Sequence, residues 1–199
     1  MKTLRTSIFV CLLVFVFLQI EASGKSIINT KHNFSDTGPG KVKIKATAKG
    51  ETLCIFCHTP HNTIRNVPYL WNRKDSTANY IPYQSSTLYA TVGQPTGTSK
   101  LCLSCHDGTI ALGAVISKLQ EIPFAAGIRF IPKGPAMLGT DLSDDHPVSF
   151  VYDTALAASN PELADPSTLP SEVKLDKHGQ LQCTACHDPR PPHYLNHHS

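Results

Sequence analysis

The stretch CIFCHTPHN, residues 54 to 62, places two cysteines two residues apart, a histidine directly after them and another histidine three residues later. The arrangement of two cysteines and a histidine returns as CLSCH at 102–106 and as CTACH at 183–187. Six of the seven cysteines in the 199-residue chain belong to these motifs, and the seventh, Cys11, lies near the N-terminus. The three motifs therefore decide how the chain is interpreted.

The C-x-x-C-H spacing is the attachment signature of c-type haem. Two thiols add to the two vinyl groups on one porphyrin edge, a single helical turn presents both sulfurs, and the next residue directs its imidazole at the iron. The sequence thus predicts three covalently bound haem c groups with His58, His106 and His187 as proximal iron ligands. The predicted attachment residues are Cys54 and Cys57, Cys102 and Cys105, and Cys183 and Cys186.

Three other uses of paired cysteines account for the pattern less well. A zinc site combines C-x-x-C pairs with histidines, but it gives no reason for a histidine after every pair. A disulfide framework suits an exported chain, yet three pairs of cysteines that are close in sequence would cross-link a long chain poorly. Thiol redox chemistry does not need three copies of the motif.

The second histidine of the first motif, His61, lies three residues after His58 and so shares its face on a helical turn. The porphyrin plane separates His61 from the iron bound by His58, so His61 is expected to ligate a neighbouring haem. His32 and His146 lie in polar turn segments and are the other expected distal ligands. The weaker candidates for this role are His178, His193, His197, His198 and Met137.

The chain resembles multihaem c-type cytochromes with the doubled C-x-x-C-H motif, which occur mostly in bacteria that respire metals or other extracellular acceptors. The likeness covers most of the mature chain and includes KHNFS, CIFCHTPHN, YLWNR, SKLCLSCHDGTIALG, DLSDDHPVSF and CTACHDP. It implies bis-histidine haems that carry electrons, with distal ligands at the positions of His32, His61 and His146.

One departure from that family concerns the third motif, which in the family often continues as CHDPH. Here it reads CHDPR, with Arg190 in place of the second histidine. Three spare ligands then remain for three haems, which favours His32, His61 and His146. The alternative is that His193 takes the missing role and that one of those three is free.

The N-terminal residues 1–24 have the pattern of a secretory signal peptide: a short basic segment, an apolar run of about 13 residues and then small residues. Residues 25–199 are expected to form one trihaem cytochrome c domain, exported to the periplasm or the cell surface, with no membrane span after cleavage. The formal net charge is +3, and the basic residues are scattered, which argues against a nucleic-acid partner.

The mature segment is rich in turn-forming residues and poor in long apolar periodic runs. We expect a mainly irregular fold with few short α-helices and minor β structure, whose core is built from haems. Helices are predicted over 108–120 and over 153–165, the latter capped by Asp153, and strands over 41–49, 127–134 and 146–153.

A haem iron with two strong protein ligands has no open position for a substrate, so the sequence predicts an electron-transfer protein and not an enzyme. Its expected partners are other redox proteins, such as cytochromes and quinol-oxidising or terminal reductase complexes, and self-assembly through haem stacking remains open. The alternative is a haem enzyme or ligand sensor in which one iron lacks a strong sixth ligand.

Overall fold

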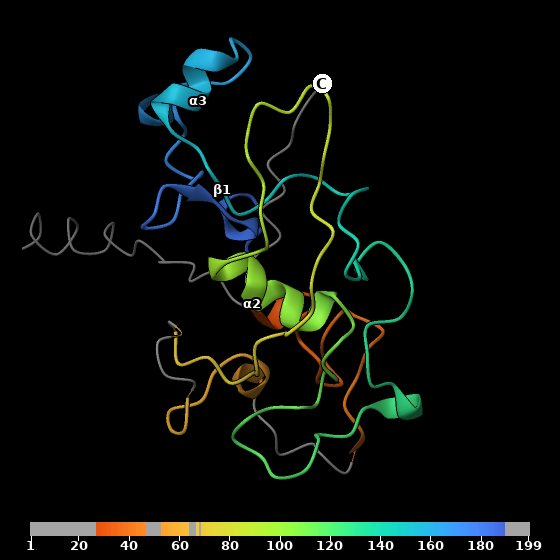
Figure 1. Ribbon diagram of the computed structural model, residues 1–199. Helices are drawn as coiled ribbons and strands as arrows, with labels where there is room; N and C mark the ends of the chain where they lie inside the picture. Colours follow the sequence, from red (N-terminus) through yellow and green to blue (C-terminus); the bar gives the residue numbers. More distant parts are fainter. Residues whose placement is uncertain (1–26, 47–52, 64–66, 68, 190–199) are drawn as a thin grey trace, which may run out of the picture.

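The computed structural model describes residues 27–46, 53–63, 67 and 69–189, and most of them lie in turns and irregular segments (Figure 1). Its regular elements are α2 (Gly97–His106), α3 (Thr154–Ser159), β1 (Phe150–Val151) and β2 (Gln180–Leu181). Short 3-10 helices include η3 (Leu53–Phe56), η4 (Ala125–Gly127) and η6 (Cys183–Ala185), with others at Ile27–Asn29 and Pro166–Thr168. The predicted mainly irregular fold with few short helices and minor β structure is confirmed.

Helix α2 occupies the middle of the molecule, between the N-terminal segments and the elements β1 and α3 (Figure 1). The helix begins at Gly97, whose φ of +50° is a left-handed conformation that favours glycine. It ends at His106, and the Asp107 amide closes it by donating to the Leu103 carbonyl oxygen at 2.9 Å. The second attachment motif is therefore the last turn of this helix.

The two-stranded sheet leads directly into the third attachment motif. β1 pairs with β2 in antiparallel register, Phe150 opposite Leu181 and Val151 opposite Gln180. The strand predicted over 146–153 is thus confirmed, but only over two residues. Helix α3 follows β1, and its Asp153 cap accepts a 2.8 Å hydrogen bond from the Leu156 amide as predicted, although the helix stops at Ser159 instead of reaching residue 165.

The helix predicted over 108–120 does not form, and the reason is that its carbonyl groups have other partners. The carbonyl oxygens of Ala111 and Leu112 accept hydrogen bonds from Arg73, at 3.1 and 2.7 Å. Gly113 lies so close to Ile122 that an added Cβ would be 2.0 Å from its carbonyl oxygen. The segment is therefore an irregular loop packed against Arg73 and Ile122.

The two other predicted strands are also largely absent from the described part of the chain. Residues 127–134 form no strand, and Pro132 in this segment has no amide hydrogen to donate. The prediction over 41–49 reduces to one isolated bridge between Ile44 and Phe124, and residues 47–49 lie outside the described residues.

The hydrophobic core consists of two small clusters. The larger contains Phe56, Leu112, Val115, Ile122 and Phe124 and contacts the attachment cysteines Cys57 and Cys105. The smaller contains Tyr80, Leu103 and Leu142. These clusters are modest for a chain of this length, so the prediction that haems complete the core stays open. In the part of the chain that the structure describes, no helix is both long and apolar enough to cross a membrane.

Two adjacent polar residues, Asn72 and Arg73, are completely buried and connect the first two attachment motifs. The Asn72 side-chain amide donates to the Ile55 carbonyl oxygen at 2.6 Å, and its main-chain amide donates to the Cys57 carbonyl oxygen at 2.9 Å. Arg73 donates to the Ser104 carbonyl oxygen inside the second motif at 2.9 Å. The hydrogen bonds of Asn72 and Arg73 thereby hold η3 beside α2.

Replacing Asn72 by alanine is expected to destabilise the fold. Asn72 also bonds Ser117 twice, donating to Oγ at 2.8 Å and accepting from the amide at 2.9 Å. Leaving these buried groups without partners costs roughly 2–4 kcal/mol in the free energy of unfolding, which lowers the thermal midpoint by at least about 4 °C. Thermal unfolding of the purified protein measures this effect. Asn79→Ala, at an exposed position, is the matched control, and equal midpoints for both variants would contradict the role of Asn72.

Candidate haem-attachment site

Each C-x-x-C-H motif forms one helical turn, as predicted. In the first motif the His58 amide donates to the Cys54 carbonyl oxygen at 2.7 Å, and in the third the His187 amide donates to the Cys183 carbonyl oxygen at 2.9 Å. The second motif lies within α2. The six cysteines of the motifs are free thiols, so the described part of the chain does not contain the disulfide framework considered as an alternative.

The second and third motifs lie against each other. The Cys102 thiol donates a hydrogen bond to the Cys183 sulfur, which raises the pKa of Cys102 and lowers that of Cys183. Beside them, the Cys183 amide donates to Ser99 Oγ at 2.9 Å, and the hydroxyl oxygens of Thr98 and Thr184 are 2.6 Å apart. The attachment sites at 102–106 and 183–187 are therefore direct neighbours.

Gln182, almost completely buried, fixes the segment that precedes the third motif. Its Nε2 donates to Asp176 Oδ2 at 2.8 Å, and its Oε1 accepts from Ser149 Oγ at 2.9 Å and from the Ser99 amide at 3.3 Å. One side chain thus joins the start of α2, the residue before β1 and the third motif.

Burial changes the acidity of two thiols in the first two motifs, Cys57 and Cys105. Burial raises the pKa of the Cys57 thiol to about 12, and the nearby Cys105 thiol adds to the rise. Burial also raises the pKa of Cys105. Because the thiolate is the reactive form, burial makes Cys57 and Cys105 less reactive thiols, whereas the hydrogen bond from Cys102 lowers the pKa of Cys183 and favours its thiolate.

Two proximal histidines are oriented by main-chain carbonyl groups. The Nδ1–H of His58 donates to the Tyr69 carbonyl oxygen at 2.5 Å, and the Nδ1–H of His106 donates to the Ala136 carbonyl oxygen at 2.7 Å. Because a carbonyl oxygen can only accept, each Nδ1 carries a proton, and in the neutral imidazole Nε2 is then the nitrogen with the free lone pair. In metal sites, such a hydrogen bond from the second ring nitrogen fixes the tautomer and the orientation of the ligating imidazole.

Two predicted distal ligands lie next to proximal histidines. The ring centres of His32 and His106 are 6.1 Å apart, and those of His146 and His187 are 6.3 Å apart. Burial, followed by the nearby His106, lowers the pKa of His32, which favours the neutral form that a metal requires. The structure therefore brings together four of the six predicted iron ligands as two pairs.

The remaining candidates have no such neighbour among the described residues. His58 has the Trp71 ring against it, 6.1 Å between centres, and His61 is exposed with no ring contact to another described histidine. His178 is exposed in a turn where its amide donates to Asp176 Oδ1. Met137 packs its sulfur beside Gly108. Arg190, His193, His197 and His198 lie outside the described residues, so the role of His61 stays a prediction.

The site fits a porphyrin better than a bare metal ion. Among the described residues, no group of three or more histidine, cysteine or acidic side chains converges to hold a metal. A haem needs only two protein ligands because the porphyrin supplies the other four, and histidine pairs meet that need. In addition, the buried Trp71 Nε1–H beside His58 lacks an acceptor, which a haem carboxylate could supply.

Sequence reasoning missed the buried polar residues around the motifs, namely Asn72, Arg73, Asp107, Gln182 and the hydroxyl of Tyr80. Asp107 follows His106 and accepts from Tyr80 Oη at 2.6 Å and from the Thr109 amide at 2.8 Å. An acidic residue directly after C-x-x-C-H was the available signal for Asp107. Nothing in the sequence distinguished Arg73 from the exposed basic residues.

The chain matches none of the protein-family models against which it was scanned, and a search of curated proteins finds no match.

The Tyr80–Asp107 hydrogen bond predicts a specific loss of stability at high pH. Burial, together with this bond, raises the pKa of Tyr80 from 10.0 to about 12. The protonated phenol therefore stabilises the folded state fully below pH 10 and loses that contribution as pH rises through 12. Tyr80→Phe should lower the free energy of unfolding near neutral pH by about 1.5–3 kcal/mol and flatten the decline above pH 10.

Thermal midpoints recorded from pH 7 to pH 12 measure this effect. Tyr89→Phe, at an exposed tyrosine, is the control and should follow the wild-type curve. Parallel pH profiles for the wild type and Tyr80→Phe would show that the bond does not shift the titration of Tyr80.

Proposed function

We propose that this chain is an exported electron-transfer protein that carries three covalently bound c-type haems. Its proposed core is completed by these haems, and it belongs with the multihaem c-type cytochromes that its motifs resemble. The proposed attachment residues are the six cysteines of the three motifs, with His58, His106 and His187 as proximal ligands. When bound, the haems supply one-electron transfer.

The observation that carries the proposal is the spacing of the two histidine pairs. With a metal–nitrogen distance of about 2.0 Å, as in zinc–imidazole bonds, and roughly 1.1 Å from nitrogen to ring centre, two imidazoles flanking one metal have centres about 6.2 Å apart. The separations of 6.1 Å and 6.3 Å match this spacing. They support His32 as the partner of His106 and His146 as the partner of His187.

The proposed chemistry follows from these ligands. Two histidines leave no open coordination position, so the protein's residues hold the iron instead of directing substrate chemistry at it. The axial ligands and their hydrogen bonds set the potential, and here the Ala136 carbonyl group, bonded to His106, increases the basicity of that ligand. The proposed partners are other redox proteins of the periplasm or the cell surface.

A haem enzyme or ligand sensor is the second candidate, and one observation favours it. Among the described residues, His58 has no imidazole beside it at the spacing of the other two pairs. In the electron-transfer account its partner is His193 of the C-terminal segment and His61 is free, because the porphyrin plane separates His61 from the iron of its own motif. In the sensor account that iron is open.

Visible and electron paramagnetic resonance spectra of the purified mature protein separate the two candidates. Three haems per chain, all low-spin, are expected for an electron carrier. A high-spin fraction near one third would favour the open-iron candidate, and a chain without haem would refute both.

Removing a distal histidine is expected to convert one haem from low-spin to high-spin. His146→Ala should do so at the third motif and His32→Ala at the second, each leaving two haems unchanged. His178→Ala, at an exposed turn, is the control. The same spectra measure the outcome, and a fully low-spin His146→Ala protein would remove that histidine from the ligand set.

A further inference from the structure

Arg73 is a completely buried arginine whose hydrogen-bond acceptors are all uncharged. Its Nε donates to Ser104 Oγ at 3.2 Å, and its Nη1 donates to the Leu112 carbonyl oxygen at 2.7 Å. Its Nη2 donates to the carbonyl oxygens of Ser104 at 2.9 Å, Ala111 at 3.1 Å and Ile110 at 3.5 Å. The guanidinium group is thus well hydrogen-bonded but not neutralised by these partners.

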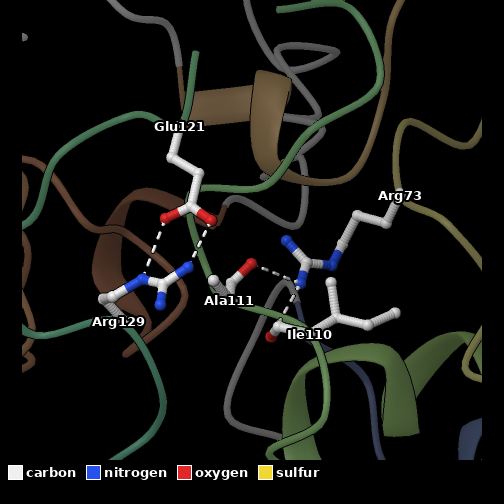
Figure 2. Close-up of polar contacts among 5 residues, drawn as sticks. All are labelled: Arg73, Ile110, Ala111, Glu121 and Arg129. Atoms are coloured by element: carbon white, nitrogen blue, oxygen red, sulfur yellow. Dashed lines mark hydrogen bonds and ion pairs between the residues drawn. The ribbon is translucent and has the colours of Figure 1, made fainter. Parts of the chain in front are cut away.

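The contrast with Arg129 is visible in Figure 2. Arg129 is exposed, and its Nε and Nη2 donate to the two carboxylate oxygens of Glu121 at 3.0 and 2.6 Å. In the same view Arg73 donates to the uncharged carbonyl oxygens of Ala111 and Ile110. Among the described residues, no carboxylate forms an ion pair with Arg73. Asp107, the buried acid that follows the second motif, accepts hydrogen bonds from Tyr80 and Thr109 instead.

A buried charge is normally paired with an opposite charge or binds a metal, because removing it from water is costly. Arg73 keeps its charge under all ordinary conditions. The fold therefore retains a full positive charge in its interior, and its hydrogen bonds hold that charge in one place.

The position of this charge is defined by the attachment motifs. Ser104, which accepts two of the Arg73 hydrogen bonds, lies between Cys102 and Cys105. The preceding residue, Asn72, is bonded to the Cys57 carbonyl group of the first motif. The two haem carboxylates lie on the porphyrin edge remote from the vinyl groups that bind cysteine, whereas Arg73 bonds Ser104 between the two cysteines of the second motif.

We propose that the buried positive charge of Arg73 raises the reduction potential of the haem on the second motif. It raises the potential of the haem on the first motif to a smaller extent. Oxidation adds one positive charge at the iron, and a nearby buried cation disfavours that change. At an effective dielectric constant of about 20, a unit charge roughly 10 Å away shifts such an equilibrium by more than tenfold. This inference rests on the proposed function.

The consequence for electron flow follows from the place of the second motif. Helix α2 contacts the third motif through Cys102 and Cys183 and the first through Asn72 and Arg73. A raised potential at this position makes the central haem the one that holds an electron between the other two.

The test compares midpoint potentials in Arg73→Gln, which removes the charge, and Arg73→Lys, which keeps it. Haem is first counted per chain, and the three midpoints are then resolved by spectroscopically monitored redox titration. Arg73→Gln should lower one midpoint by about 59 mV or more, equivalent to a tenfold change in the ratio of reduced to oxidised haem. Arg73→Lys and the exposed control Arg129→Gln should leave all three midpoints unchanged.

Ser104→Asp is a second test that keeps Arg73 in place. This substitution puts a carboxylate at the position that accepts from Arg73 Nε. The carboxylate neutralises the cation, so the midpoint that falls in Arg73→Gln should fall here too. If Arg73→Gln does not bind haem, Ser104→Asp alone decides the question. If either variant binds three haems and all three midpoints are unchanged, the inference is overturned. Loss of haem from both variants would also overturn it. A wild-type chain without haem would instead refute the proposed function.

Discussion

Hydrogen bonds from buried polar side chains hold the three attachment motifs in one body. The first and third motifs are isolated helical turns and the second is the last turn of α2, so main-chain groups at their ends need partners from elsewhere in the chain. Asn72 and Arg73 provide them for the first two motifs. Ser99 Oγ accepts from the Cys183 amide of the third motif, and Gln182 accepts from the amide of Ser99. Because the apolar clusters are small, these bonds, more than side-chain packing, fix where the cysteines and histidines lie.

The same bonds relate local structure to the proposed electron transfer. They place the second motif between the other two: the Cys102 thiol is hydrogen-bonded to the Cys183 sulfur, and Cys57 and Cys105 pack against one hydrophobic cluster. They also leave the proximal and distal histidines half-buried or exposed, on surfaces that a large apolar cofactor would cover. A chain with a small core of its own and paired imidazoles at its surface is well suited to fold around haems.

The local structure of the candidate site could be predicted from sequence because the C-x-x-C-H motif is short and continuous. The spacing of Cys54, Cys57 and His58 fixes a single turn whatever surrounds it, and the cap at Asp153 is equally local. The helix expected over 108–120 failed because Arg73, distant in sequence, bonds the carbonyl groups of that segment. The pairing of His32 with His106 and of His146 with His187 likewise depends on long-range contacts that no spacing rule contains.

The central claim is that the six cysteines bind three haems, and the intact mass of the mature chain tests it most directly. The protein should be purified from a host that attaches c-type haem and exports it, and then weighed under denaturing conditions that remove any group not covalently bound. The account predicts the mass of residues 25–199 plus three haems. A mass equal to that of the bare polypeptide would contradict it.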